Sequence, residues 1–561
     1  MYDEIQYYYM ATMPGTRLLI ITLGSEQNTS KGTLLPWNAS YLGGNWSNIT
    51  QCMIGGNDSW TTQHVVFNNG ANDQWALKNS PYSMAYFTRD DIPTHFGVAE
   101  AWTVGDMYQE SILSSIDSNR VFWFSGSAGI PGGPQKPDSG GPVIQNTDHR
   151  PGCHHTLPNS DCWPLNWHPI MTHLQEAGVT WQVYQDNPNI HGQDILSGFQ
   201  DFNATKPGDP LYDRGLARND SNTLLTFYKQ AVNGTLPQVS WIISDHSLSE
   251  GSGYRPQDGA WQQTAVVAAV CVGNSTNSTA LFVTYDNAGG WFDHVPPTHS
   301  LNGTAGEWME DPYGEFGYTA AGPGFRLPFY IISPWTRGGN VFTEHADHSS
   351  QIMFLEQWLQ AIGHNVTTGE IDSWRRQYMS NLVNAFDFDH PDYSIPNPPL
   401  PPSPPKNLTG FCSTQYPDNL TSIPYNQVRS DALTVEQGFK QVRGNLTEGR
   451  YLVFERNGFA LSNTGQGFIS ITPATPKHET PMQEWVLQQY EAFGTSFKFY
   501  SVTDKRYIDT VDIVYLGNSE GYSLFSDGIY WDIDTNGNFQ LSPTPAGFHV
   551  FSVSYGNRAW T

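Results

Sequence analysis

The sequence is poor in charged residues, and basic residues are the scarcer of the two kinds. Only 14% of the 561 residues are charged, and 27 Lys and Arg stand against 53 Asp and Glu, which gives a formal net charge of −26. Phosphate backbones bind to basic patches, so this balance argues against nucleic acid as a partner. The same deficit argues against electrostatic docking on anionic membranes.

Long apolar runs are missing as well. No stretch reaches the length of a transmembrane helix, so we predict no membrane-spanning segment. The short run Leu18–Leu23 lacks the charged, apolar and small-residue order of a signal peptide. Asn-x-Ser/Thr acceptors are nevertheless dense, and they predict a secreted protein that carries glycans. They are Asn28, Asn38, Asn45, Asn48, Asn57, Asn203, Asn219, Asn233, Asn274, Asn277, Asn302, Asn365, Asn407, Asn419 and Asn445.

Cysteine is scarce too, and the five cysteines predict one or two disulfides with one thiol left over. Cys153 and Cys162 are close enough in sequence to form a local bridge. The alternative is a zinc site that includes His154 and His155, but the cysteine spacing is not that of common zinc ligand sets.

One stretch, residues 281–297, organises the rest of the chain. Its opening, Leu281–Tyr285, is a β-branched and aromatic run that predicts a buried strand. Asp286 and Asn287 follow where the strand should end, and two glycines then turn the backbone. Ligands of open α/β sheets bind beyond the carboxyl ends of strands, so Asp286 is either a functional carboxylate or the cap of a turn.

Residues 281–297, LFVTYDNAGGWFDHVPP, resemble the YD-x-x-GG-[FW]-[FY]-DHVPP signature of the phosphoesterase family of phospholipases C and acid phosphatases. This family is a branch of the alkaline-phosphatase-like superfamily, so the resemblance implies an α/β fold with a mostly parallel sheet flanked by helices. It also implies a hydrolase acting on phospholipids or other phosphate esters. Further landmarks, typical of fungal-type members, recur in order across roughly residues 34–390, at Tyr41–Trp46, Ala71–Met84, Ala99–Ser111, Ser118–Ser127, Ser240–Glu250 and Asp347–Trp358.

The resemblance also implies site residues. Asp286 and Asn287 stand where the family commonly has two acidic residues that suit a hard cation, which makes a divalent metal the possible cofactor. His64 stands where members carry an active-site histidine, although a lone histidine beside valine is more often structural. The remaining candidates are Asp293, His294 and His348.

Several positions depart from the family pattern. The family places a Thr or Ser nucleophile before an Asn-Arg turn, and counting back from Asn119-Arg120 puts that position on Ile116, which cannot attack phosphorus. Ser115 could take over after a register shift, although it would point differently. Gly251 stands where members usually carry a histidine. The family's acidic-Asn-x-Ser-Phe-Asp motif is not found, so we expect residues 1–33 to be an atypical N-terminus from a truncated gene prediction.

Composition divides the chain. We predict a phosphoesterase domain over residues 34–395, a Pro-rich linker over 396–405 and an all-β domain, trefoil- or sandwich-like, over 406–561. The last domain would bind carbohydrate or lipid surfaces, or only stabilise the protein. Within the first, we predict strands at Val121–Phe124, Val179–Tyr184, Ser240–Ser244 and Phe329–Ser333, and helices at Met171–Gly178, Asp258–Ala269 and from Asp347 or Ser349 onward.

Two functions follow from these observations. The first is a secreted phospholipase C-type phosphoesterase that uses Asp286, His64 and a hydroxyl near Ser115. The second is a non-catalytic secreted relative that binds glycan, a lipid surface or phosphate. Because Ile116, Gly251 and Asn287 all depart from the pattern, we expect the activity of this chain to be impaired or lost.

Overall fold

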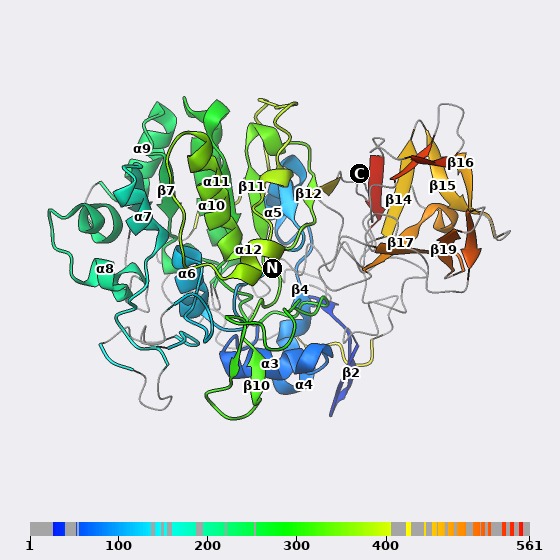
Figure 1. Cartoon of the computed structure of the whole chain (residues 1–561), viewed down its shortest axis with the longest axis horizontal. Helices are drawn as coiled ribbons and strands as arrows, with labels where there is room; N and C mark the ends of the chain where they lie inside the picture. The colour runs from blue at the N-terminus through cyan, green and yellow to red at the C-terminus, as the bar shows by residue number, and fades with distance from the viewer. Residues whose placement is uncertain are drawn as a thin grey trace.

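The computed structural model describes a mixed α/β part followed by a series of β-strands (Figure 1). The described residues are 26–39, 52, 55–135, 141–146, 151–153, 160–186, 195–218, 221–251, 254–404, 422–427, 442–444, 451–456, 458–465, 469–475, 480–489, 497–504, 506–510, 514–517, 530–533, 539–542 and 549–553. Within them, no helix is long and apolar enough to cross a membrane.

A five-stranded mixed sheet forms the centre of the α/β part. Its strand order is β13 (Val442–Arg443), β12 (Val341–Phe342), β5 (Thr103–Gly105), β11 (Phe329–Ile332) and β8 (Leu281–Thr284). β12 runs parallel to β5 and β13, whereas β11 runs antiparallel to β5 and β8. A separate parallel pair joins β6 (Trp181–Tyr184) to β7 (Val239–Ile242). The α/β class is thus supported, but the central sheet is of mixed direction rather than mostly parallel as expected, because β11 runs antiparallel to both of its neighbours.

The predicted strand at Leu281–Tyr285 is present as β8, but its residues are half-buried rather than buried. The neighbouring strand β11 is the buried one. All four residues of β11 are buried, as expected for an uninterrupted apolar run in the middle of a sheet. Helices accompany the strands throughout the α/β part (Figure 1). They are α3 (Trp60–Phe67), α4 (Trp75–Lys78), α5 (Pro93–Ala101), α6 (Ile116–Ser125), α7 (Ile170–Glu176), α8 (Gln200–Asn203), α9 (Leu224–Asn233), α10 (Pro256–Val272), α11 (His348–Ala361) and α12 (Ser373–Tyr378).

One predicted strand is wrong. Val121–Phe124 lies inside helix α6, which begins after Ser115 in an extended conformation and ends at Gly126, whose φ of 84° is left-handed. A glycine in that conformation is a common helix terminator. A short buried apolar run fits a helix as well as a strand, which is why periodicity alone misassigned it.

The Pro-rich segment and residues beyond it contact the α/β part. The Thr94 hydroxyl of α5 donates to the Pro399 carbonyl at 2.8 Å, and β13 extends the central sheet through Val442. Val453 and Val502 belong to the same buried cluster as Phe96 of α5.

The other C-terminal strands pair with one another, chiefly in an eight-stranded sheet. They are β14 (Tyr451–Arg456), β15 (Phe459–Asn463), β16 (Ile469–Pro473), β17 (Trp485–Gln489), β18 (Phe497–Ser501), β19 (Tyr507–Thr510), β20 (Val514–Gly517), β21 (Tyr530–Ile533), β22 (Phe539–Ser542) and β23 (His549–Val553). Their trefoil- or sandwich-like topology and the domain boundaries stay predictions.

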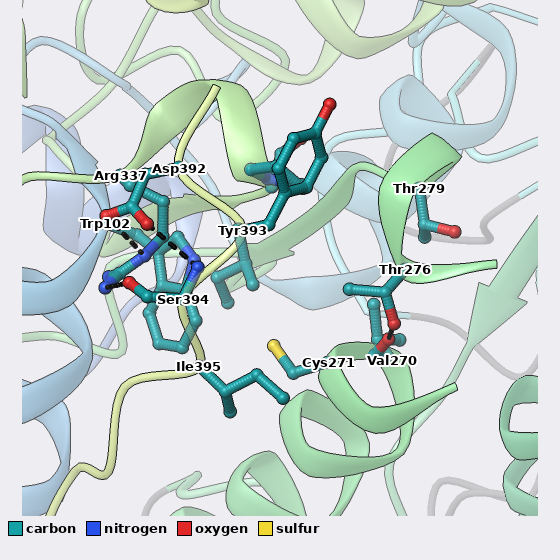
Figure 2. A pocket seen from close by; sticks show the side chains of 13 residues that line it. Trp102, Val270, Cys271, Thr276, Thr279, Arg337, Asp392, Tyr393, Ser394 and Ile395 are labelled. Atoms are coloured by element: carbon teal, nitrogen blue, oxygen red, sulfur yellow. Dashed lines mark hydrogen bonds and ion pairs between the residues drawn. The ribbon is translucent and has the colours of Figure 1, made fainter. Parts of the chain in front are cut away.

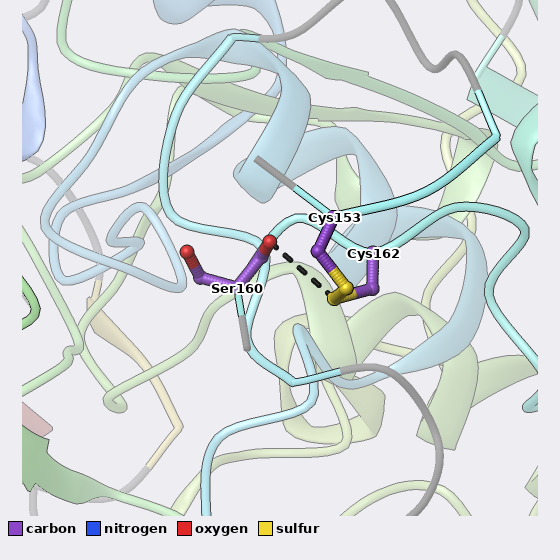
Figure 3. The surroundings of a disulfide bond; sticks show 3 residues. All are labelled: Cys153, Ser160 and Cys162. Atoms are coloured by element: carbon purple, nitrogen blue, oxygen red, sulfur yellow. Dashed lines mark hydrogen bonds between the residues drawn. A yellow bond between two sulfur atoms is a disulfide. The ribbon is translucent and has the colours of Figure 1, made fainter. Parts of the chain in front are cut away.

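The predicted local disulfide is confirmed. Cys153 and Cys162 are joined, and Figure 3 shows the Ser160 carbonyl beside the Cys162 sulfur, 3.5 Å away. Cys52 is also disulfide-bonded, while Cys271 is a free thiol. Cys412 and the landmark Tyr41–Trp46 lie outside the described residues.

Candidate functional site

Asp286 lies just beyond the end of β8 and forms an ion pair with helix α6. Its Oδ2 accepts a hydrogen bond from Arg120 Nε at 2.9 Å, and its Oδ1 accepts from the backbone N–H of Asn287 at 3.0 Å. The side chains of Arg120 and Asp286 are 16% and 27% exposed, so both reach solvent. Ligands of open α/β sheets bind beyond the carboxyl ends of strands, and this solvent-reaching pair lies at such a position.

The start of α6 is held in place by Asn119. Its side-chain oxygen accepts from the backbone N–H groups of Ser111 and Ile112 at 2.9 and 3.1 Å, and its amide donates to the Ser114 and Ser115 carbonyls at 2.8 and 3.2 Å. The loop before the helix is therefore tied to the helix itself. This explains physically why an Asn-Arg pair stands here, since Asn119 builds the turn and the next residue reaches Asp286.

The helix register decides what faces Asp286. Ile116 is the first residue of α6 and lies four residues before Arg120, so both side chains project from the same face. The face turned to Asp286 therefore carries an aliphatic side chain at its N-terminal end. Ser115 is the buried N-cap residue, and its hydroxyl makes no capping hydrogen bond.

His348 holds the backbone of Asp286. The His348 Nε2 lies 2.8 Å from the Asp286 carbonyl, and its Nδ1 lies 3.0 Å from the Tyr108 hydroxyl. A carbonyl oxygen can only accept, which assigns the proton to Nε2 and leaves Nδ1 as the acceptor. Burial lowers the pKa of His348, in keeping with this neutral form.

A buried charge cluster supports the start of α11 beneath His348. Asp347 caps the helix by accepting from the Ser349 N–H at 3.1 Å, and it also accepts from the Ser111 hydroxyl at 2.8 Å. Arg375 contacts Asp347 and donates to Glu307 at 2.6 Å and to the Ser111 carbonyl at 2.7 Å. These contacts fix α11 against the loop that precedes α6.

The predicted metal ligands do not present a free ligand set. Asp286 is engaged by Arg120, while the Asn287 amide donates to Asp58 at 2.6 Å and its oxygen accepts from the Gly289 N–H at 3.1 Å. Throughout the described ranges, no group of three or more His, Cys, Asp or Glu side chains is arranged to hold a metal ion. The residues present here do not fit a divalent cation.

Glu110 lies beneath the Asp-Asn turn and binds its backbone. Its carboxylate accepts from the N–H groups of Ala288 and Phe325, each at 3.1 Å, and from the Gln63 amide at 3.4 Å. Burial is the dominant influence and raises the pKa of Glu110 well above its ordinary value, although the three donors lower it. Gln63 thereby connects helix α3 to the turn after β8.

His64 points away from this contact network. Its two ring nitrogens lie 2.8 and 2.9 Å from the carbonyls of Trp60 and Ala320, and its ring stacks on Phe316. Burial is the largest influence and lowers the pKa of His64, whereas the two carbonyls raise it. Of the described polar contacts of His64, none is with Asp286.

Asp293 and His294 are buried. Asp293 is fully enclosed and receives two hydrogen bonds from the Arg326 guanidinium, each 2.7 Å long, together with one from the Val295 N–H at 2.9 Å. Burial alone would raise the pKa of Asp293, but Arg326 holds it below its ordinary value. His294 Nδ1 lies 3.6 Å from the Asp293 carboxylate. This geometry is that of a structural anchor.

Gly251 leaves space where family members carry a histidine. Its N–H donates to the Ser249 hydroxyl at 3.3 Å, and a Cβ added there would meet that oxygen alone, at 3.2 Å, among the described residues within 4 Å. Among the described residues, no large side chain fills the space beside Gly251, the position where the resemblance led us to expect a histidine.

Sequence reasoning missed Arg120, Glu110 and Asp58 as parts of the site. The Asn119-Arg120 pair served only to locate the nucleophile position in the sequence. That Arg120 lies so close to that position was the available signal that it belongs to the site. Glu110 and Asp58 gave no signal, because their contacts with Ala288 and Asn287 join residues far apart in the chain.

A separate pocket lies at the other end of the sheet (Figure 2). Its lining includes Ile332 of β11, which pairs with Leu281, the end of β8 opposite to Asp286. Cys271 and Arg337 also line it, and Arg337 is paired with Ser394 at 3.1 Å. This pocket and the Asp286 site therefore lie at opposite ends of β8.

Comparisons with known proteins agree on the family. The profile described as "Phosphoesterase family" matches residues 8–360. The chain is 35% identical to a non-hemolytic phospholipase C of Burkholderia pseudomallei over 61% of this chain and 50% of the relative, and 31% identical to one of Pseudomonas aeruginosa over 67% and 53%. It is 29% identical to phospholipase C A of Mycobacterium tuberculosis over 67% and 74%. The chain thus spans about half the length of the first two relatives.

Proposed function

This chain belongs to the phosphoesterase family, and from that premise we propose that it is a phospholipase C-type phosphoesterase whose hydrolytic activity is impaired. The substrate class would be a phospholipid or another phosphate ester, by analogy with relatives that are named phospholipases C. The observation that carries the proposal is the aliphatic Ile116 at the first position of α6.

A hydroxyl at the start of a helix would sense the partial positive charge of the helix N-terminus and attack phosphorus with its help. Ile116 offers neither a nucleophile nor a proton acceptor. Ser115 has a hydroxyl without a capping bond, but it precedes the helix and does not share the face of Arg120. Losing one member of a cooperative catalytic group usually costs several orders of magnitude in rate.

The ion pair supports the same proposal. Arg120 is the kind of side chain that binds a phosphate, because a guanidinium matches two phosphate oxygens. In this chain its Nε is bonded to Asp286, so a phosphate ester would have to share or replace that contact. The pair therefore suits weak anion binding better than rapid turnover.

We also propose that the protein is secreted and carries glycans. Eight of the glycosylation acceptors are exposed in the described part of the chain, as attachment requires. They are Asn28, Asn57, Asn203, Asn233, Asn274, Asn277, Asn302 and Asn365.

Turnover of p-nitrophenylphosphorylcholine by the full chain tests the proposal. We expect slow or absent hydrolysis from the unaltered protein and a gain of at least tenfold from Ile116→Thr. Ile116→Val is the matched control, since valine has the shape of threonine without its hydroxyl, and it should give no gain.

Substantial turnover by the unaltered chain that disappears in Asp286→Ala would refute the impairment. If that turnover also disappeared in Ser115→Ala but survived Ile116→Val, Ser115 would be the nucleophile. The family's nucleophile position would then have been assigned one residue too late in this chain.

A further inference from the structure

A buried chain of polar side chains leads from helix α5 to the residue before Asp286. The Tyr285 hydroxyl donates to Glu250 at 2.8 Å, and His95 Nε2 lies 3.0 and 3.1 Å from the two oxygens of the same carboxylate. The side chains of His95 and Glu250 are 0% and 4% exposed. Three separate elements, α5, the turn after β7 and the end of β8, thus meet at one carboxylate.

Glu250 occupies this place in spite of an unfavourable backbone conformation. Its φ is +61°, a left-handed value that side-chain-bearing residues rarely adopt. Helix α10 approaches so closely that a Cβ on Gly259 would lie 2.1 Å from the Glu250 Cγ. The glycine therefore makes room for a glutamate whose position is fixed from two sides.

The contacts of His95 indicate which of its ring nitrogens carries the proton. A carboxylate only accepts, so Nε2 carries the proton that is donated to Glu250. The other ring nitrogen, Nδ1, is buried and has no hydrogen-bond partner in the described part of the chain. A buried polar atom without a partner costs free energy, and the hydrogen bond from His95 to Glu250 offsets part of that cost.

Asp286 is consequently held on both sides. His348 binds its carbonyl at 2.8 Å, and Tyr285, immediately before it, is tied to Glu250. We propose that His95 is a positioning residue that acts through Glu250 and Tyr285 to aim the Asp286 carboxylate at Arg120. This inference rests on the proposed function of the Asp286 site, and it assigns support to His95 on α5, a helix with no described hydrogen bond to Asp286.

Hydrogen exchange of the full chain, followed by mass spectrometry, tests the inference without requiring turnover. We expect Tyr285→Phe, which removes one hydroxyl, and His95→Phe, which removes the donor, each to speed exchange in residues 285–290 at least tenfold. His95→Gln keeps an N–H donor and should return exchange to within threefold of the unaltered protein. Strand β11, residues 329–332, should be unchanged in all three variants.

Unchanged exchange in residues 285–290 of Tyr285→Phe would overturn the inference, as would equal acceleration in β11, which marks general destabilisation. Unchanged exchange in residues 285–290 of a folded His95→Phe would overturn the inference as well. Should His95→Phe fail to fold, Tyr285→Phe tests the link from Glu250 to Asp286, and near-normal exchange in His95→Gln, which keeps a donor, tests His95. In the Ile116→Thr background, loss of positioning should lower kcat while KM changes less than threefold. Altered exchange with no turnover in any variant would refute the proposed function and leave the positioning role standing.

Discussion

Replacing Asp293 by Asn tests whether this motif residue anchors the fold or takes part in the site. The substitution keeps the shape of the side chain and removes its charge, while Arg326 stays fully buried with its guanidinium against a neutral amide. Asp106, 3.5 Å away, is a second acidic neighbour of Arg326. Breaking a buried ion pair from one side typically costs about 3–5 kcal/mol, because the other charge loses its compensation.

Urea unfolding at pH 7, followed by tryptophan fluorescence, measures this cost. We expect Asp293→Asn to lower the free energy of unfolding by about 3–5 kcal/mol. The control is Asp392→Asn, which removes a half-exposed partner lying 3.7 Å from Arg337 and should cost less than about 1 kcal/mol.

The pH dependence of the same pair has a definite sign. Arg326 holds the pKa of Asp293 below its ordinary value, so its stabilising contribution is present above the unfolded-state pKa of about 3.9 and is lost as the pH falls through the lower folded-state pKa. Asp293→Asn should remove that part of the acid sensitivity. Unchanged stability of Asp293→Asn together with loss of turnover or phosphate binding would refute the structural role of Asp293 and would indicate that it takes part in the site.

Three further predictions concern two buried carboxyl groups and the local disulfide. Burial is the main cause that raises the pKa of Asp161 to about 7, and Asp117 adds to it, so the folded chain keeps a proton between about pH 4 and 7 that the unfolded chain releases. Stability should therefore fall as pH rises through that window, by up to about 1.4 kcal/mol per pH unit, and Asp161→Asn should flatten the slope of Tm against pH. Glu110→Gln points an amide NH2 at backbone donors and should cost about 1–3 kcal/mol in denaturant unfolding. Replacing Cys153 and Cys162 by Ser opens a short loop and should cost about 2 kcal/mol in the same assay, with the unaltered protein under reducing conditions as the comparison.

The local parts of the fold were predictable, and the distant pairings were not. Strand β8, its Asp-Asn turn and the capped start of α11 at Asp347 follow from short-range patterns, and the structure has all three. Val121–Phe124 failed because a short apolar run carries no period that separates helix from strand. The residues that mark this segment as a helix are those at its two ends, the N-cap residue Ser115 and the C-cap residue Gly126.

The site divides in the same way. Asp286 could be nominated from its place after a strand, but its partner Arg120 lies 166 residues away in the chain. The contact between His95 and Glu250 joins residues 155 apart. Neither pairing leaves a trace in the local sequence, because both are made by the packing of elements that are far apart in the chain.

Strand β13 determines what may be cut from this protein. Val442 and Arg443 lie well beyond the Pro-rich linker in the sequence, yet they pair with β12 and form the edge strand of the central sheet. A shortened protein ending at the prolines would leave the N–H and C=O groups of β12 unpaired along that edge. Unpaired sheet edges can pair with strands of other molecules, so such a fragment should self-associate more than the full chain does.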